Sequence, residues 1–286
     1  MTPVVLLSPS PGSGKTTVAV ALAQKFRAQG RTCSLIRQGG DRGASSDAAL
    51  FSRFSAGDDA DASITEAPGG DPSAAPRARA VVIADAATDP SAVAAFCSDV
   101  GPRLAGLVLN RVPVKRSESA IGALEAVGVK VLLSLPEDRL LATPTLGRVA
   151  DALNAQSMFF DPNCEHALEG LVIASIGADP GQDYFRRQDA SAVIVRSDKP
   201  DLQLAAINAG ASCLIVTGGL PFLSYVTDRA KADEIPLIRT RMDTVETVTT
   251  IEGLYAAEPF SGGPDKLSRL ALLTDGFDPT PLLVAG

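Results

Sequence analysis

The stretch that decides the fold is Val4-Val-Leu-Leu-Ser8-Pro-Ser-Pro-Gly-Ser-Gly-Lys15-Thr-Thr-Val18, close to the N-terminus. Its four consecutive apolar residues predict a strand that is buried on both faces. Residues 15–28 have the pattern of an amphipathic helix, and a turn rich in Pro, Ser and Gly joins the two elements. A strand, a glycine-rich turn and a helix in this order predict an α/β fold with a parallel sheet.

The turn itself predicts a phosphate-binding site. Backbone N–H groups at the start of a helix face the turn, and the helix dipole adds positive potential there. Lys15 is predicted to reach the β and γ phosphates of a nucleotide and to act in catalysis, and the Thr16 hydroxyl to bind Mg²⁺. The usual pattern has glycine where Pro9 stands, so a turn with an incidental lysine remains the alternative. The residues expected to contact the nucleotide are Pro11, Gly12, Ser13, Gly14, Lys15, Thr16 and Thr17.

Two later strands end in polar side chains. Asp85 closes the apolar run 81–85 and is predicted to hold Mg²⁺ through water and to act in catalysis, or else to cap the helix that follows. Asn110 closes the run 106–110 and is predicted to hydrogen-bond the edge of adenine, or else to form a turn. ATP and Mg²⁺ are therefore the expected cofactors.

Strand-like and helix-like stretches alternate along the chain and predict an α/β fold throughout. The expected domains are a P-loop domain over residues 1–160, a smaller α/β domain over 168–258, and a tail over 259–286. Residues 39–76 contain several Gly-Asp clusters and few large apolar residues. We expect a loop there, apart from a short helix over 47–54. The loop is expected to become ordered when a ligand binds. The predicted elements are strands at 4–7, 32–36, 80–85, 106–110, 129–133, 171–176, 192–195, 213–217 and 237–239, and helices at 15–28, 90–100, 118–127, 145–153, 202–209, 221–231, 244–256 and 266–273.

Composition narrows the class of partner. The 286 residues carry a net charge of −7 with a pI near 4.8, aromatic residues are 5%, and Trp is absent. Such a chain is expected to repel nucleic-acid phosphates and to lack stacking platforms for bases. Its apolar runs are shorter than the roughly 20 residues that span a bilayer. We expect a cytoplasmic protein that binds neither nucleic acid nor membrane and whose four cysteines are reduced and buried.

The N-terminal half resembles the dethiobiotin-synthetase-like family of P-loop proteins in its turn, in Asn110-Arg-Val-Pro113 and in Pro136-Glu-Asp138. The resemblance implies that Asp47 helps to bind Mg²⁺, with a solvated helix charge as the alternative reading. Arg37 stands where that family has a substrate-handling lysine, and Asp85-Ala-Ala-Thr88 where it has a glycine-rich run. The residues that bind the nucleotide in that family are therefore retained here, whereas those that handle the substrate are replaced.

The C-terminal half resembles a DRTGG domain in Asp179–Phe185, Arg196–Ala206 and Leu214–Gly219. The two domains in this order are similar to the N-terminal regulatory region of long bacterial phosphate acetyltransferases, without the catalytic domain. This resemblance implies a homodimer, and a metabolic enzyme regulated in trans as the partner. Within the DRTGG-like part, Thr217-Gly-Gly219 is predicted either to bind an anion or simply to form a tight turn.

These observations favour a nucleotide-dependent regulator or switch with slow ATPase activity. One alternative is an ATP-dependent ligase of the dethiobiotin synthetase type that acts on a small carboxylate or carbamate. Another is a non-enzymatic dimeric scaffold that retains the turn as a relic.

Overall fold

The computed structural model describes residues 2–39, 44–57, 59–159, 166–168, 170–174, 185–187, 191–257 and 259–283. The chain forms two compact units. The first unit contains residues 1–141, 260–262 and 266–286, and the second contains residues 142–259 and 263–265.

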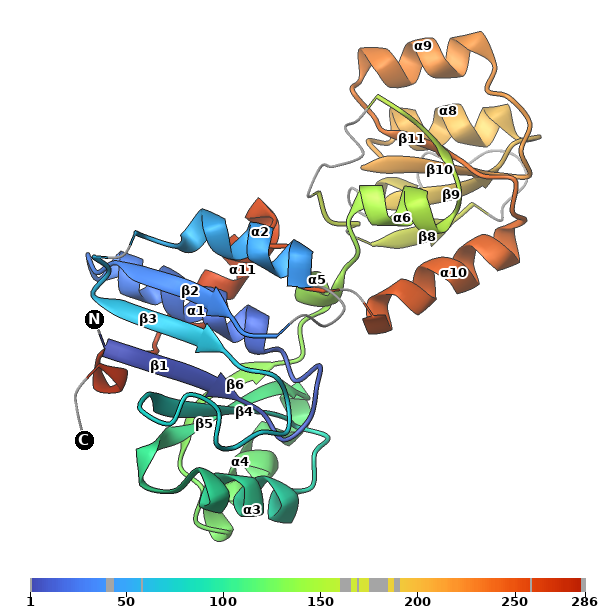
Figure 1. Cartoon of the computed structure of the whole chain (residues 1–286). Helices are drawn as coiled ribbons and strands as arrows, with labels where there is room; N and C mark the ends of the chain where they lie inside the picture. The colour runs from blue at the N-terminus through green and yellow to red at the C-terminus, as the bar shows by residue number, and fades with distance from the viewer. Residues whose placement is uncertain are drawn as a thin grey trace. The chain divides into compact units, whose positions relative to one another are not determined.

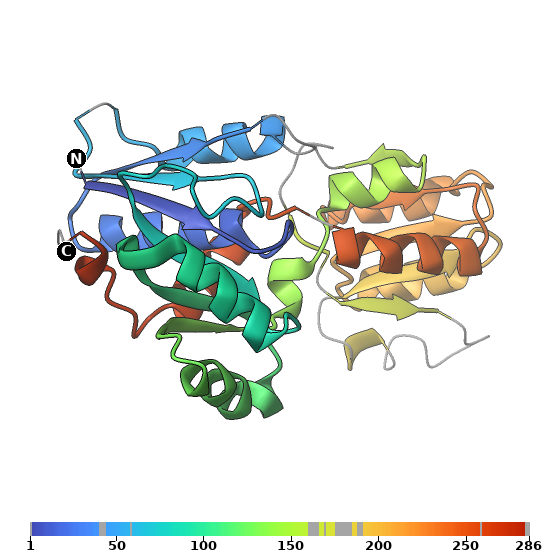
Figure 2. The same ribbon diagram turned by 60° about the horizontal axis from the view of Figure 1, so that its bottom comes forward.

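The first unit is built on a six-stranded parallel sheet with the strand order β2-β3-β1-β4-β5-β6. Helices α1, α2 and α11 cover one face of this sheet, and α3 and α4 cover the other (Figures 1 and 2). In chain order its elements are β1 (Thr2–Leu7), α1 (Lys15–Ala28), β2 (Cys33–Arg37), α2 (Ala44–Phe54), β3 (Ala62–Glu66), β4 (Arg79–Asp85), α3 (Pro90–Val100), η1 (Gly101–Arg103), β5 (Leu104–Val112), η2 (Val114–Arg116), α4 (Ser117–Ala126), β6 (Val131–Pro136), α5 (Arg139–Ala142), α11 (Pro264–Leu273) and η3 (Thr280–Leu282).

Strand β1 is buried on both faces, as its apolar sequence predicts. Val4 and Leu6 point into the core beneath α1 and α2, and Val5 and Leu7 into the core beneath α3. All four side chains are fully buried. Alternate residues of a strand face opposite sides of the sheet, so a continuous apolar run suits a sheet that is covered twice.

The prediction of a loop over residues 39–76 is wrong in one important place. Residues 62–66 form β3, which lies between β2 and β1 and pairs in parallel with both. The sequence of β3 is Ala-Ser-Ile-Thr-Glu, and its buried residues include polar Ser63 and Glu66. With only one large apolar side chain, the segment has neither the continuous nor the alternating pattern that indicates a strand.

The C-terminal segment belongs to the first unit, whereas we expected a separate tail. Leu270 and Leu282 are buried in the same core as α1. The Lys25 Nζ donates to the carbonyl of Asp275 at 3.0 Å, and the Gln29 Nε2 donates to Asp278 Oδ1 at 2.9 Å. These contacts join residues about 250 positions apart in sequence, beyond the reach of local pattern analysis.

The second unit has a five-stranded sheet with the order β7-β11-β10-β9-β8, in which β7 is antiparallel and the other four strands are parallel. Helices α8 and α9 pack on one face, and α6 and α10 on the other. Residues 146–158, which form α6 and β7, were expected in the first domain, and the strand itself was not predicted. The elements are α6 (Leu146–Ala152), β7 (Gln156–Met158), β8 (Leu171–Ile173), β9 (Ala192–Arg196), α8 (Pro200–Asn208), β10 (Cys213–Thr217), α9 (Ser224–Ala232), β11 (Leu237–Arg239) and α10 (Thr244–Ala257).

The predicted fold class is thereby confirmed: a parallel α/β sheet is followed by a smaller α/β unit.

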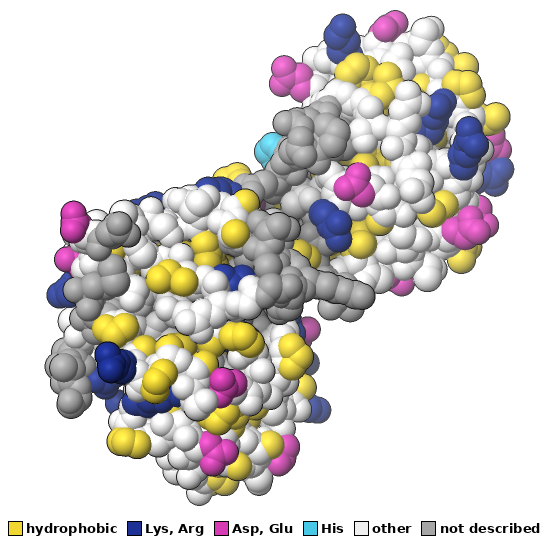
Figure 3. Space-filling model, viewed as in Figure 1, with side chains coloured by type: hydrophobic (Ala, Val, Ile, Leu, Met, Phe, Trp, Pro, Cys, Tyr) yellow, Lys and Arg dark blue, Asp and Glu magenta, His cyan; other side chains and the backbone are white. Residues whose placement is uncertain are grey.

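None of the described helices is long and apolar enough to cross a membrane. Basic and acidic side chains are interspersed on the faces shown in Figure 3.

Three cysteines are buried, namely Cys33, Cys97 and Cys213. Burial raises the pKa of Cys33 to about 11, although the nearby Arg27 charge opposes the shift. Burial also raises the pKa of Cys97 to about 11. Both thiols are therefore protonated at neutral pH and poorly nucleophilic. Cys164 lies outside the described residues.

Candidate functional site

The candidate site lies at the carboxyl ends of β1 and β4. From β1 the chain leads through α1 to β2 on one side of the sheet, and from β4 it leads through α3 to β5 on the other side. Adjacent strands whose connections leave in opposite directions form a topological switch point, where open α/β sheets bind their ligands. The β1–α1 turn therefore occupies the position that the topology favours for a site.

The β1–α1 turn has the backbone geometry of an anion cradle. Gly12 and Gly14 have φ angles of 75° and 90°, in the left-handed region, and Gly14 is the N-cap of α1. A Cβ atom on Gly14 would lie 2.1 Å from Asn110 Nδ2, so glycine is required here on two counts. The first turn of α1 contains no acidic residue, and its positive dipole end is left uncompensated within the helix.

Lys15 is held over the start of this turn. Its side chain is buried, with 7% of the residue exposed, and its Nζ donates to Ser8 Oγ at 2.9 Å. The Ser8 and Ser13 hydroxyls both donate to the carbonyl of Ser10, at 2.7 and 2.6 Å. The serines therefore brace the turn and keep the lysine ammonium at its mouth.

Asn110 reaches the turn from β5. Its Nδ2 donates to the carbonyl of Ser13 at 2.9 Å, and the residue is buried. Here the amide nitrogen anchors the turn, a contact that the sequence did not reveal. A contact between Asn110 and the nucleotide base stays a prediction.

The segment after β3 closes against the same turn. The N–H of Gly70 donates to the carbonyl of Ser8 at 2.9 Å. A Cβ atom on Gly69 would lie 3.0 Å from the backbone nitrogen of Pro11. Close backbone packing therefore explains Gly69, whereas Gly70 is explained by its φ angle of 84° in the left-handed region.

Glu66, at the end of β3, is the site residue that sequence analysis missed. Its Oε2 accepts a hydrogen bond from Thr16 Oγ1 at 2.9 Å, and its Oε1 pairs with Arg37 NH1 at 3.2 Å. The only sequence signal for it was an acid just before the Ala67-Pro-Gly-Gly70 turn. The contact exists because β3 pairs with β1 and β2, which aligns Glu66 with Leu6 and Arg37.

Asp85 accepts hydrogen bonds from two neighbouring groups. Its Oδ2 accepts from Arg111 NH1 at 3.1 Å, and its Oδ1 accepts from the N–H of Ala87 at 2.9 Å. Arg111 has a φ of 53°, unusual for a residue with a side chain. The magnesium and catalytic roles of Asp85 stay predictions.

The donors near the turn suit a hard cation. Magnesium takes oxygen ligands, commonly one or two carboxylates together with phosphate oxygens and water. The Thr16 hydroxyl and the Glu66 carboxylate supply such oxygens side by side. Among the described residues, no group of three or more His, Cys, Asp or Glu side chains could hold a metal by itself. Asp47 lies in α2, but its side chain is outside the described part of the chain.

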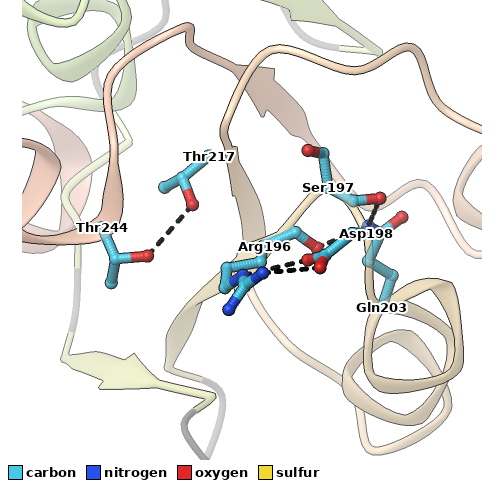
Figure 4. A network of polar contacts seen from close by, with 6 residues as sticks. All are labelled: Arg196, Ser197, Asp198, Gln203, Thr217 and Thr244. Carbon is cyan, nitrogen blue, oxygen red and sulfur yellow. Dashed lines mark hydrogen bonds and ion pairs between the residues drawn. The ribbon is translucent and has the colours of Figure 1, made fainter.

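The second unit also has polar side chains at the carboxyl ends of its parallel strands (Figure 4). Arg196 pairs with Asp198 through two contacts of 2.9 and 2.6 Å. The hydroxyls of Thr217 and Thr244 lie 3.2 Å apart. Because these contacts join the side chains to one another, they are explained by local structure, and the anion site at residues 217–219 stays a prediction.

Comparison with known proteins supports the assignment of the second unit. Residues 148–254 match the DRTGG domain family. This confirms the predicted DRTGG domain, and the matched residues include β7 and most of α6. The resemblance of the first unit to dethiobiotin synthetases stays a prediction.

One solved structure with similarity to the chain is the regulatory region of Clostridium perfringens pyrophosphatase, which comprises CBS and DRTGG domains in complex with its activator, diadenosine tetraphosphate. The identity is 20%, the match covers 51% of this chain and 71% of that one, and the TM-score is 0.32.

Proposed function

We propose that this chain is a nucleotide-dependent regulator in which the first unit binds ATP with Mg²⁺ and the DRTGG domain transmits the bound state to a partner. The partner proposed is a metabolic enzyme regulated in trans, and the protein is proposed to act as a cytoplasmic homodimer. ATP hydrolysis in this proposal is slow and serves to reset the switch.

The observation that carries the proposal is the placement of Lys15 at the β1–α1 turn. A buried lysine, two glycines of positive φ and the start of α1 meet at the switch point of the sheet. Backbone N–H groups and a lysine ammonium at a helix N-terminus suit the phosphates of a nucleotide. In a chain with a net charge of −7, this local concentration of positive potential favours a specific anionic ligand.

Magnesium would offset the charge of the phosphate oxygens when it is bound with the nucleotide. In our proposal the Thr16 hydroxyl faces the cation, and Lys15 holds the β and γ phosphates. Asp85 and Asp47 are the further acids proposed for the metal. The remaining phosphate contacts are proposed for Pro11, Gly12, Ser13, Gly14 and Thr17.

The substrate half of a ligase site is poorly supported. The guanidinium at position 37, where a ligase would hold its acid, pairs with Glu66. Arginine also binds carboxylates through a planar fork and does not replace a compact ammonium. At residues 86–88 the side chains of Ala, Ala and Thr occupy space that glycine would leave for close backbone approach. These features favour a switch over the ligase alternative.

In our proposal the effect of nucleotide binding passes from one unit to the other through the segments that connect them in the chain. Residues 142–259 leave the first unit after β6 and return to it before α11. Helix α11 packs in the same core as α1, and α1 begins at the β1–α1 turn. Helix α1, which would sense the phosphates, therefore shares a core with α11, the helix that follows the DRTGG domain in the chain.

Thermal unfolding with and without ATP-Mg tests the nucleotide site. At 100 times its Kd a ligand stabilises the native state by about 2.7 kcal/mol, which raises Tm by roughly 5–10 °C for a unit of this size. Lys15→Ala should abolish the shift, and Ala keeps α1 intact as a good helix former.

The matched control is Lys130→Ala, because Lys130 is exposed just before β6, at the opposite end of the strands. This variant should keep the wild-type shift. An equal shift in Lys15→Ala would refute the assignment of the site.

A further inference from the structure

The first unit has a groove along β6, away from the β1–α1 turn. Its volume is about 480 Å³, within the range of pockets that bind ligands. The lining comes from residues 132–134 of β6 and from residues 273, 274 and 276–278, where α11 ends and the chain continues. Asp278 in this lining is bonded to Gln29, which directly follows α1. Because the 14 residues of α1 span about 21 Å, the groove lies at the opposite end of that helix from the turn.

Strand β6 offers an unpaired backbone edge to this groove. It pairs with β5 on one side, and among the described residues no strand pairs with its other side. The segment 273–278 does not take that place, because the N–H groups of Thr274, Asp275 and Phe277 donate to carbonyls of residues 270–274. An unpaired strand edge is a template to which an extended peptide adds as a further strand. The groove is therefore suited to an extended segment of chain.

The walls of the groove are apolar and held in place from behind. Leu132, Leu133, Leu273 and Phe277 all pack against the core that contains α1. Each of these side chains is only partly buried, and each belongs to the lining of the groove. A bound segment with apolar side chains would remove their exposed parts from water, which is favourable.

Asp278 is the charged residue of the lining, and its carboxylate is fixed. Its Oδ1 accepts from Gln29 Nε2 at 2.9 Å, and from the N–H and the hydroxyl of Thr280 at 2.9 and 2.6 Å. The bonds from Thr280, and then the bond from Gln29, hold the pKa of Asp278 below its usual value. In the described part of the chain no donor bonds the second oxygen, Oδ2. The groove therefore presents a negative charge in a fixed position.

We propose that this groove binds an extended segment of a partner protein by strand addition to β6, with a Lys or Arg side chain of that segment paired to Asp278. Each feature selects one property of the partner. The unpaired edge selects an extended backbone, the leucine and phenylalanine walls select apolar side chains, and the carboxylate selects a cation between them. Binding of the segment does not require the nucleotide, so the proposal stands or fails separately from the proposed function.

The probe is the peptide acetyl-Thr-Val-Lys-Val-Thr-amide, titrated into the ¹⁵N-labelled full chain and followed by NMR. We expect saturable shifts at the backbone amides of residues 131–136 and 273–278. Exchange of the peptide lysine for glutamate should weaken binding by about 2–5-fold, the strength of an exposed ion pair. Asp278→Asn retains the oxygen that accepts from Gln29 and Thr280 and should weaken the lysine peptide to a similar extent. Asp278→Lys should reverse the preference between the two peptides.

A steric variant tests whether the peptide occupies the groove itself. A Cβ atom on Gly276 would meet no heavy atom within 4 Å, and its φ is not in the left-handed region. Gly276→Leu therefore places a side chain in the groove without strain and should abolish detectable binding. Gly122→Leu is the matched control, because Gly122 is exposed in α4 and a Cβ atom there also meets nothing within 4 Å. The control should bind the peptide as the wild type does.

Two further ligands separate strand addition from simple binding of a cation. A peptide N-methylated at both valines lacks two backbone N–H donors and should not bind. Butylammonium carries the charge without the backbone and should not reproduce the shifts in β6. Equal binding of the methylated peptide or of butylammonium would overturn the proposal, since the groove would then be a site for small cations.

The remaining outcomes are equally decisive. Shifts confined to residues outside β6 and 273–278, or no saturable shift up to millimolar peptide, would overturn the proposal. Unchanged affinity in Gly276→Leu would do the same. If a thermal scan shows that a variant is unfolded, the comparison of the lysine, glutamate and methylated peptides on the wild type carries the test.

Discussion

Replacing Leu270 with Ala tests whether the C-terminal segment is part of the first unit. The Leu270 side chain is fully buried in the core that contains α1, β1 and β3. Removal of a buried leucine side chain costs about 2–5 kcal/mol, depending on how far the cavity collapses. For a unit of this size the expected fall in Tm is roughly 4–20 °C.

The control lies two residues away on the same helix. Leu272 is 70% exposed, so Leu272→Ala removes an equal side chain with almost no loss of burial. Changes at such exposed positions usually stay within about 0.5 kcal/mol. Helix propensity changes identically in the two variants, and the difference between them isolates the core contact.

Urea unfolding gives the free energies, and hydrogen exchange followed by mass spectrometry locates the effect. We expect Leu270→Ala to lower protection in residues 1–141 more than in 142–259. Equal destabilisation by Leu270→Ala and Leu272→Ala would refute the reasoning. A loss of protection confined to residues 142–259 would do so as well, because the segment would then stabilise the other unit.

Two further predictions concern the nucleotide. Asn110→Ala removes the hydrogen bond to Ser13 and should weaken ATP by roughly 2–12-fold, as a net bond of about 0.5–1.5 kcal/mol implies. Competition with GTP should also show that the variant has lost the preference for adenine, whereas an unchanged preference would leave Asn110 as an anchor of the turn only. ATP turnover should stay slow and unstimulated by diaminopelargonate with bicarbonate. A cyclised product seen by mass spectrometry would favour the ligase over the switch.

Local patterns in the sequence determined most of the elements. The limits of α1 and α3 were predicted to the residue, because an apolar pattern and its caps involve only near neighbours. Asp89 caps α3 by accepting from the N–H of Ala92 at 3.1 Å. At the start of α10, Asp243 and Glu246 form both bonds of a capping box, at 3.1 and 2.8 Å. Where the determining contacts lie within one turn, the sequence was sufficient.

The candidate site was only half visible in the sequence. The β1–α1 turn was recognised because strand, glycines, lysine and helix are consecutive. Glu66 was missed because it lies 50 residues from Thr16 and because the strand that carries it has a weak apolar pattern. Asp85 was placed correctly at the end of β4, but its ion pair with Arg111 joins two different strands, and no sequence pattern signalled it.

The sequence by itself thus determined the α/β class, the turn with its lysine, and the DRTGG domain, since each depends on residues that are near neighbours or on a contiguous match. Only the tertiary structure decided that β3 lies beside β1, that Glu66 contacts Thr16, and that residues 266–283 belong to the first unit. These features come from pairing and packing between distant segments. Their stability arises from burial that is shared by both partners, so neither segment alone carries the signal.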